Sequence, residues 1–544
     1  MAAASGEVDY IIVGGGSAGC VVAARLSEDP AVSVCLLEAG GRGDSLLVRW
    51  PAGFARLQGP RWRWEWQTAP QAHLAGRRIP TPQGKVLGGG SAVNGMVYIR
   101  GNRRDYDHWA ALGNPGWGYA DVLPYFRRSE DNGRFVDAYH AVGGPLGVSD
   151  QRAPSELTRR FVRAGQEAGI AHNPDFNGAR QSGVGFYQVT QRDGCRCSSA
   201  HAFLHPAMER PNLTVRTGVR VTRIVVAAGR AVGVEIAGRG GHERLMARGE
   251  VVVSAGGINS PKLLMLSGIG PADELSALGV APVHDLPGVG RNLHDHVDAY
   301  TCIRLNRPVS YTGHDRGPMA LRHGLEYLMF GSGAITSNAC EGGLFMNSAG
   351  GEDWPDVQLH FMPTALTTHQ PLDGHGVTVL GSSMRPKSRG SVRLASADPF
   401  DEPLIDPNLL SDPDDVAHNV AAVKIARDIL AAPSFRDLNA GEAYPGPGCR
   451  NDADVADYVR RTAKTDYHPV GTCKMGSDPL AVVDQNLKVR GLEGLRVIDA
   501  SIMPAIVSGN TNAPAIMIGE RGADALRGRR LPPSAPLLSP KNFL

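Results

Sequence analysis

The feature that most constrains the fold is a short apolar run followed at once by a glycine-rich loop. Residues 9–13 read DYIIV, a run typical of a buried strand. Residues 14–19 read GGGSAG, a G-x-G-x-x-G sequence, and apolar residues then recur at helical spacing to Leu26. In such a loop the first glycine allows a tight turn, the second lets the backbone approach a pyrophosphate, and the third lets the helix pack on the strand. The segment predicts a dinucleotide-binding βαβ unit.

An acidic residue stands where such a unit would hold a ribose. A second strand predicted over residues 32–37 is followed by Glu38, 19 residues after Gly19. A carboxylate at this spacing accepts a hydrogen bond from a ribose 2′-hydroxyl and repels a 2′-phosphate, while free N–H groups at the helix start face the phosphates. These features fit NAD and FAD equally.

Two later segments repeat the order of strand and glycine loop. Residues 250–254 predict a strand that leads into Gly256 and Gly257, and Ser260-Pro261 predicts the N-cap and first position of a helix. Residues 495–498 predict another strand, which ends at Asp499 and precedes a glycine loop and a helix. A nucleotide-binding domain is therefore assembled from segments far apart in the chain.

The 544-residue length requires a second lobe, because single cores stop growing near about 250–300 residues. Residues 374–394 predict two strands joined by a polar turn, and residues 415–431 and 452–461 predict helices, so this lobe is expected to be α+β with an antiparallel sheet. The predicted boundaries are 1–155, 206–310 and 465–530 for the nucleotide-binding domain, 156–205 and 311–464 for the substrate-binding domain, and 531–544 for a C-terminal tail.

Charge, termini and cysteines exclude several classes. A net charge of +2 gives no basic field for nucleic acid. The start has no cationic segment before an apolar one, and no run of about 18 apolar residues occurs, so neither a signal peptide nor a transmembrane helix is expected. Eight cysteines without regular spacing suit reduced thiols in a cytoplasmic protein, with Cys195 and Cys197 as packed thiols rather than metal ligands. No metal site is expected.

Four stretches together resemble the glucose–methanol–choline (GMC) oxidoreductases, which are FAD enzymes acting on alcohols. They are VGGGSAGC at 13–20, GKVLGGGSAVNGMVYIRG at 84–101, GGINSPKLLMLSGIG at 256–270, and YHPVGTCKMG at 467–476 with GNTNAPAIMIGE at 509–520. The resemblance spans about residues 7–527 and is strongest to the bacterial choline, alkanol and sorbose dehydrogenases. NPDFNG at 173–178 and RPKSRGSVRL at 385–394 are especially similar to L-sorbose dehydrogenase. The implied fold is α/β: a Rossmann-like FAD-binding domain with an inserted α+β substrate-binding domain built on an antiparallel sheet.

The resemblance assigns a set of residues to FAD. The glycines at 88–90 present backbone N–H groups without side chains in the way, and Asn94 offers one donor and one acceptor to the flavin. Some relatives bind FAD covalently through a histidine in this loop; residues 92–94 contain neither His nor Cys, so FAD is expected to be noncovalent. The expected cofactor-binding residues are Gly14, Gly16, Ser17, Ala18, Gly19, Glu38, Ala39, Gly88, Gly90, Ser91, Asn94, Gly95, Met96, Val97, Val221, Ala255, Gly256, Asp499, Ala500, Asn510, Thr511 and Asn512.

His468 is the expected catalytic base. Alcohol oxidation removes the hydroxyl proton as hydride leaves the carbon for flavin N5, and imidazole has a suitable pKa. The resemblance assigns this role to the His of H-P-x-G-T, which is His468, and a second active-site role to Asn512. Asn512 is alternatively an ordinary helix N-cap. His294 and His296 are interpreted as structural or substrate-lobe residues, and Glu341 as a candidate contact for a cationic substrate.

The expected function is FAD-dependent oxidation of a primary alcohol, or of a polyol such as L-sorbose, to the aldehyde or ketone. The expected partners are a small alcohol and a quinone or other electron acceptor; peripheral membrane contact and the oligomeric state are left open. The alternatives are a choline dehydrogenase, an oxygen-using alcohol oxidase, a non-redox hydroxynitrile lyase of the same family, or a nucleotide-binding module without catalysis.

Overall fold

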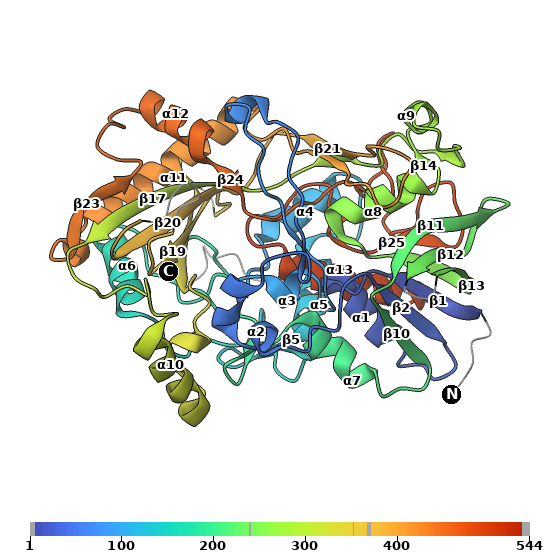
Figure 1. Cartoon of the computed structure of the whole chain (residues 1–544), viewed down its shortest axis with the longest axis horizontal. Coiled ribbons are helices and arrows are strands. Elements are labelled where there is room, and N and C mark those ends of the chain that lie inside the picture. Colours follow the sequence, from blue (N-terminus) through green and yellow to red (C-terminus); the bar gives the residue numbers. More distant parts are fainter. Residues whose placement is uncertain (1–5, 239–240, 352, 367–371, 536–544) are drawn as a thin grey trace.

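The computed structural model describes residues 6–238, 241–351, 353–366 and 372–535. Figure 1 shows two sheets at opposite ends of an elongated molecule, joined by long crossing segments.

The first sheet has a parallel core, as the βαβ prediction requires. Its order is β10-β2-β1-β13-β12-β11, with β25 paired to β13, and all pairs are parallel except those of β11 and β12. Its strands are β1 (Glu7–Val13), β2 (Val34–Glu38), β10 (Leu213–Thr217), β11 (Arg220–Ala227), β12 (Arg230–Gly238), β13 (Gly241–Val253) and β25 (Leu495–Val497). Segments from both ends of the chain therefore form one sheet, and the predicted Rossmann-like core is confirmed.

Two helices pack against each other beside this sheet (Figure 1): α1 (Ser17–Leu26) from the first βαβ unit and α13 (Asn512–Leu526) from the end of the chain. Glycines permit the close approach, because a Cβ on Gly519 would lie 2.8 Å from the Ala18 carbonyl oxygen. A Cβ on Gly19 would lie 2.0 Å from the Gly14 carbonyl oxygen, which is the packing role expected of the third loop glycine.

The second sheet is antiparallel, with the order β23-β17-β20-β19-β18-β7 and β24 paired to β17. Its strands are β7 (Gly183–Phe186), β17 (Val297–Leu305), β18 (Gly342–Met346), β19 (Val357–Met362), β20 (Gly376–Ser383), β23 (Asn439–Tyr444) and β24 (Lys464–Thr465). Helices α6 (Glu156–Glu167) and α11 (Pro413–Ala431) pack on it, and α12 (Asp452–Thr462) packs on α11. The helices predicted over 415–431 and 452–461 are confirmed.

Three sequence expectations need correction here. β17 lies in the antiparallel sheet, so the predicted boundary at residue 310 is too late in the chain. The two strands predicted within 374–394 exist, but β20 does not pair with β21 (Gly390–Arg393), which pairs with β16 (Arg291–Leu293) and β22 (Leu404–Asp406). The segment between β20 and β21 is held by α11, because the Asp415 carboxylate accepts hydrogen bonds from the backbone N–H groups of Lys387 and Ser388.

The third correction concerns the helix predicted to start at Ser260-Pro261. Helix α8 spans Gly256–Leu266 and contains Pro261 in its interior. A proline there leaves the carbonyl four residues earlier without its helical donor. That carbonyl belongs to Gly257, and the Thr472 hydroxyl donates to it at 2.6 Å. Thr472, 215 positions away from Gly257, thus supplies the missing donor and removes the energetic cost of a proline inside the helix, on which the prediction rested.

The described part of the predicted tail packs on the protein, since the Ser534 N–H donates to the Ala120 carbonyl. Residues 536–544 lie outside the described residues. All eight cysteines are free thiols. Among the described residues, none of the helices has the length and apolar character needed to cross a membrane.

Candidate active site

A cavity of about 1430 Å³ lies at the carboxyl ends of the parallel strands and extends to the antiparallel sheet. Such ends are where doubly wound sheets bind nucleotides. The predicted residues that line it are Gly14, Gly16, Ser17, Ala18, Glu38, Ala39, Gly90, Asn94, Gly95, Met96, Val97, Val221, Ala255, Gly256, His468, Asp499, Ala500, Asn510, Thr511 and Asn512.

Three predicted cofactor residues do not line the cavity: Gly19, Gly88 and Ser91. Gly19 serves helix packing, as described above. Gly88 has a φ of 92°, a conformation that favours glycine. The Ser91 hydroxyl donates to the Gly88 carbonyl at 2.6 Å and accepts from the Ser199 N–H at 2.9 Å. Gly88 and Ser91 therefore shape the second glycine loop, and their direct contact with FAD stays a prediction.

The cavity wall fits a dinucleotide. A Cβ on Gly89 would lie 2.7 Å from the Gly16 Cα, so the two glycine loops touch only because both lack side chains. Helices α1 and α13 both begin at this wall, and neither N-terminus is capped by a side chain. Their first N–H groups are therefore free for the phosphates and for the negative charge of a reduced ring system.

Glu38 is fixed by the glycine loop itself. Its carboxylate accepts the Gly15 N–H at 2.8 Å and the Gly40 N–H at 2.7 Å. Burial raises the pKa of Glu38 to about 6, although these two hydrogen bonds favour the charged form. Each oxygen keeps a second lone pair for a ribose hydroxyl.

The structure places Asn510, rather than Asn512, beside His468. The Asn510 Nδ2 lies 3.4 Å from His468 Nε2, and Gln358 Nε2 lies 3.3 Å from Asn510 Oδ1, which fixes the amide orientation. Asn512 is the first residue of α13; its side chain does not cap the helix but accepts from the Ser17 hydroxyl at 2.8 Å. Neither role expected of Asn512 matches this geometry.

His468 is held from its backbone. Its N–H donates to Asp295 Oδ1 at 2.8 Å. The preceding Tyr467 has a φ of 63°, unusual for a bulky residue, and Pro469 follows. These restrictions direct the imidazole into the cavity.

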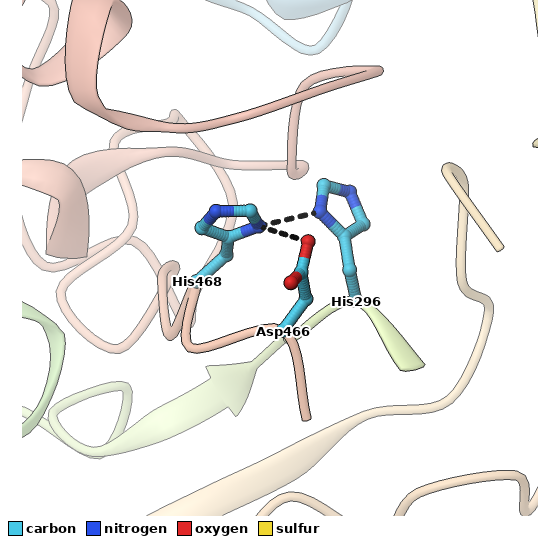
Figure 2. Close-up of side chains that lie close together, drawn as sticks. All are labelled: His296, Asp466 and His468. Atoms are coloured by element: carbon cyan, nitrogen blue, oxygen red, sulfur yellow. Dashed lines mark hydrogen bonds and ion pairs between the residues drawn. The ribbon is translucent and has the colours of Figure 1, made fainter. Parts of the chain in front are cut away.

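A second imidazole determines which nitrogen of His468 carries the proton. Figure 2 shows His296 and Asp466 converging on the same atom, His468 Nδ1, at 3.0 and 3.4 Å. His296 Nε2 lies 3.2 Å from the Met384 carbonyl, which only accepts, so Nε2 carries the proton and Nδ1 of His296 is an acceptor. His468 Nδ1 must therefore donate, which leaves Nε2 of His468 with its lone pair facing Asn510 and the cavity.

Burial favours the neutral form of this base. Burial lowers the pKa of His468, and Asp466 opposes that effect. Burial, together with the neighbouring His468, lowers the pKa of His296 to about 3, so His296 stays uncharged. Behind them Lys464 pairs with Asp298 at 2.5 Å. The described side chains His296, Asp466 and His468 are close enough to hold a metal ion, but the proton between the two Nδ1 atoms already accounts for their spacing.

One more imidazole, that of His360, faces the cavity. His360 is buried, and its Nε2 lies 3.7 Å from Asp466 Oδ2, which is an ion-pair distance.

Sequence reasoning missed His296, Asp466 and His360 as site residues. His296 lies just before β17, 172 positions from His468, and no local pattern links the two. His294 agrees with its structural interpretation, being buried with a pKa far below its usual range because of burial.

Glu341 has no free oxygen for a cation. Its carboxylate accepts from the Ser155 N–H at 2.7 Å and from the Thr158, Tyr311 and Ser337 hydroxyls at 2.6, 3.0 and 2.5 Å. The residue is fully buried and does not line the cavity. It joins elements of the second lobe.

Family comparison agrees with this geometry. Two family models described as GMC oxidoreductase match residues 8–298 and 386–519. The chain belongs to the GMC oxidoreductase family. It is therefore an FAD-dependent enzyme that oxidises CH–OH donors, as the four stretches predicted.

Relatives of this GMC oxidoreductase include an alcohol dehydrogenase [acceptor] of Pseudomonas putida, 47% identical over 95% of both chains. An oxygen-dependent choline dehydrogenase of Brucella anthropi is 41% identical over 96% of both chains. Among solved structures, pyridoxine 4-oxidase from Mesorbium loti superposes with a TM-score of 0.89 and 33% identity, covering 96% of this chain and 100% of the other.

Proposed function

We propose that this GMC oxidoreductase oxidises a primary alcohol with an apolar chain to the aldehyde, with His468 Nε2 as the base, and passes the electrons to a quinone or similar acceptor. The observation that carries the proposal is the hydrogen-bond order Met384 carbonyl, His296, His468, because it leaves the lone pair on the cavity side.

The geometry indicates how the residues of the site position the alcohol and remove its proton. Asn510 donates to the alcohol oxygen and holds it beside His468 Nε2, which takes the hydroxyl proton. Asp466 stabilises the imidazolium that forms. FAD, held without a covalent link by Glu38 and by the N-termini of α1 and α13, would supply the acceptor for the hydride that leaves the carbon.

The cavity walls favour an apolar chain over a polyol or choline. Tyr300, Met362 and Leu380 form one apolar cluster, and all three line the cavity. A polyol would leave several hydroxyls against this cluster, which is costly for unpaired polar groups. A quaternary ammonium group finds no free carboxylate at Glu341, because that side chain already accepts four hydrogen bonds.

Anaerobic mixing with alcohols tests the function. The yellow holoenzyme should bleach with linear alkanols or benzyl alcohol faster than with sorbose or choline, and a quinone or dye should restore the colour. A holoenzyme that no alcohol bleaches would favour the lyase chemistry of the family; fastest bleaching by sorbose or choline would overturn the substrate class, and rapid recolouring by oxygen alone would overturn the acceptor.

The matched variant is His468→Ala. Loss of a general base typically lowers a rate by about 10²–10⁴-fold, so alcohol should bleach the variant slowly while dithionite still reduces it quickly. Wild-type bleaching by alcohol in this variant would place the base elsewhere.

A further inference from the structure

Helix α10 (Gly317–Phe330) exposes an apolar stripe to solvent. None of its 14 residues is buried. Leu321, Leu325, Leu328 and Met329 are 66%, 48%, 75% and 65% exposed, and their spacing of i, i+4, i+7 and i+8 places them on one helix face. A helix of a globular protein normally packs such a stripe against the core. In α10 the apolar face points outward instead. Figure 1 shows α10 projecting from the edge of the molecule.

The opposite face of α10 fixes it to the protein. Ala320, His323 and Gly324 line the cavity described above. The Tyr327 ring meets Trp50 edge-on at 5.7 Å, and the helix ends at Gly331, whose φ of 58° is typical of a glycine cap. The exposed stripe therefore belongs to a well-anchored helix at the cavity wall.

The rim of the cavity lies next to this helix. Asp315, just before α10, lines the cavity and is 57% exposed at its side chain, and its carboxylate contacts Arg56, which is 60% exposed and also lines the cavity. This exposed ion pair forms part of the cavity rim beside α10.

We propose that α10 inserts its apolar stripe into the surface of an anionic phospholipid bilayer and thereby places the cavity rim at the membrane. Cations flank the stripe: Arg322 is exposed one residue after Leu321, and Arg316 at the N-cap, 3.7 Å from the Asp315 carboxylate, has a side chain 86% exposed. An outward apolar face bordered by arginines is the pattern of helices that lie in the headgroup region.

The size of the stripe favours a bilayer over a second copy of the chain. A 14-residue helix is about 21 Å long and about 10 Å wide, whereas stable protein interfaces bury about 1,200–2,000 Å² in total. One helix face supplies too little area for such an interface but is sufficient for insertion into a bilayer. Bilayer binding does not depend on the proposed function. If the proposed function holds, the cavity rim at the membrane would admit an apolar alcohol or a quinone from the bilayer, and this consequence rests on the proposed function.

Vesicle sedimentation of the holoenzyme tests the proposal. The probes are vesicles of phosphatidylcholine alone and of phosphatidylcholine with phosphatidylglycerol. Wild type should sediment with the mixed vesicles, and the triple variant Leu321→Gln, Leu325→Gln, Leu328→Gln should partition at least about tenfold less, because each side chain loses its burial among acyl chains. Arg322→Glu should lower binding to the mixed vesicles only.

A matched control separates the stripe from general surface hydrophobicity. Leu112, Leu404 and Leu480 are 42%, 46% and 43% exposed and lie outside α10; their triple change to Gln should bind vesicles as wild type does. FAD content and dye-linked activity with a water-soluble alcohol should be equal in all variants, which checks folding and tests the proposed function separately.

The proposal is overturned if wild type does not bind the mixed vesicles, or if the stripe variant and the single change Leu328→Gln both bind as wild type does. It is also overturned if sedimentation without lipid shows a dimer that the stripe variant dissociates, because α10 would then cover a second copy.

Discussion

The charge of Asp466 should set both the rate and the pH dependence of alcohol oxidation. Its Oδ2 lies 3.4 Å from His468 Nδ1. At an effective dielectric of about 20, a full positive charge at this distance gains on the order of 5 kcal/mol. Lys464 and His360 share the same carboxylate, and the imidazolium is only partly formed in the transition state, so about 2 kcal/mol is a reasonable net loss in Asp466→Asn, equivalent to about a 30-fold slower reduction.

The sign of the pH effect follows from the same contact. Only neutral His468 accepts the proton, so the rate of flavin reduction rises with pH and reaches a plateau above the pKa of the imidazole. Burial lowers the pKa of His468 and Asp466 raises it. Removing the carboxylate charge should therefore move the inflection to lower pH, while the plateau falls.

Anaerobic stopped-flow reduction with a linear alkanol, measured across pH, separates these effects. Asp295→Asn is the matched control: Asp295 contacts the backbone N–H of His468 rather than its ring, and the new amide oxygen can still accept that N–H. A plateau of Asp466→Asn within about twofold of wild type, with an unmoved inflection, would refute the electrostatic argument.

Three further outcomes are expected. Acid precipitation should release all the yellow chromophore as FAD, because residues 92–94 contain neither His nor Cys; a yellow pellet would contradict this. Glu38→Arg should bind FAD about tenfold to a hundredfold more weakly by fluorescence titration, through loss of a charge-assisted hydrogen bond, and an unchanged Kd would remove the ribose assignment. Asn510→Ala should slow flavin reduction at full FAD content, whereas Asn512→Ala should reduce FAD affinity and keep its rate per bound flavin; the reverse pattern would restore Asn512 as the substrate contact.

The first βαβ unit was predictable because its determinants are local. Strand, loop and helix lie within about 30 residues, and each loop glycine answers a steric need that the sequence states directly. The start of α8 was not predictable in this way, since Pro261 marks a helix start only when no distant donor satisfies the carbonyl of Gly257. Rules that predict helix starts consider only donors close in the sequence, so they cannot take into account a donor as distant as Thr472.

The active site divides along the same line. His468 stands in a recognisable motif. Asn510 and Asn512 are the same residue type at positions just before and at the start of α13, and a difference of two positions points their side chains in different directions. Asp466 is two positions before His468 and could have been weighed as its partner. His296 could not have been predicted as a partner, because it lies near His468 only when β17 pairs within the antiparallel sheet.

The tautomer of the base is consequently a property of how the two lobes meet. His296 lies just before β17 of the antiparallel sheet. Its Nε2–H donates to the carbonyl of Met384, just after β20, and its Nδ1 accepts a hydrogen bond from His468 Nδ1–H. A small shift between β17 and the His468 segment would break the 3.0 Å contact and leave Asp466, at 3.4 Å, as the remaining acceptor for the Nδ1 proton. Because only the Nδ1-protonated form presents a base to the cavity, packing of the substrate-binding sheet against the FAD-binding domain both closes the cavity and helps to select the reactive form of His468.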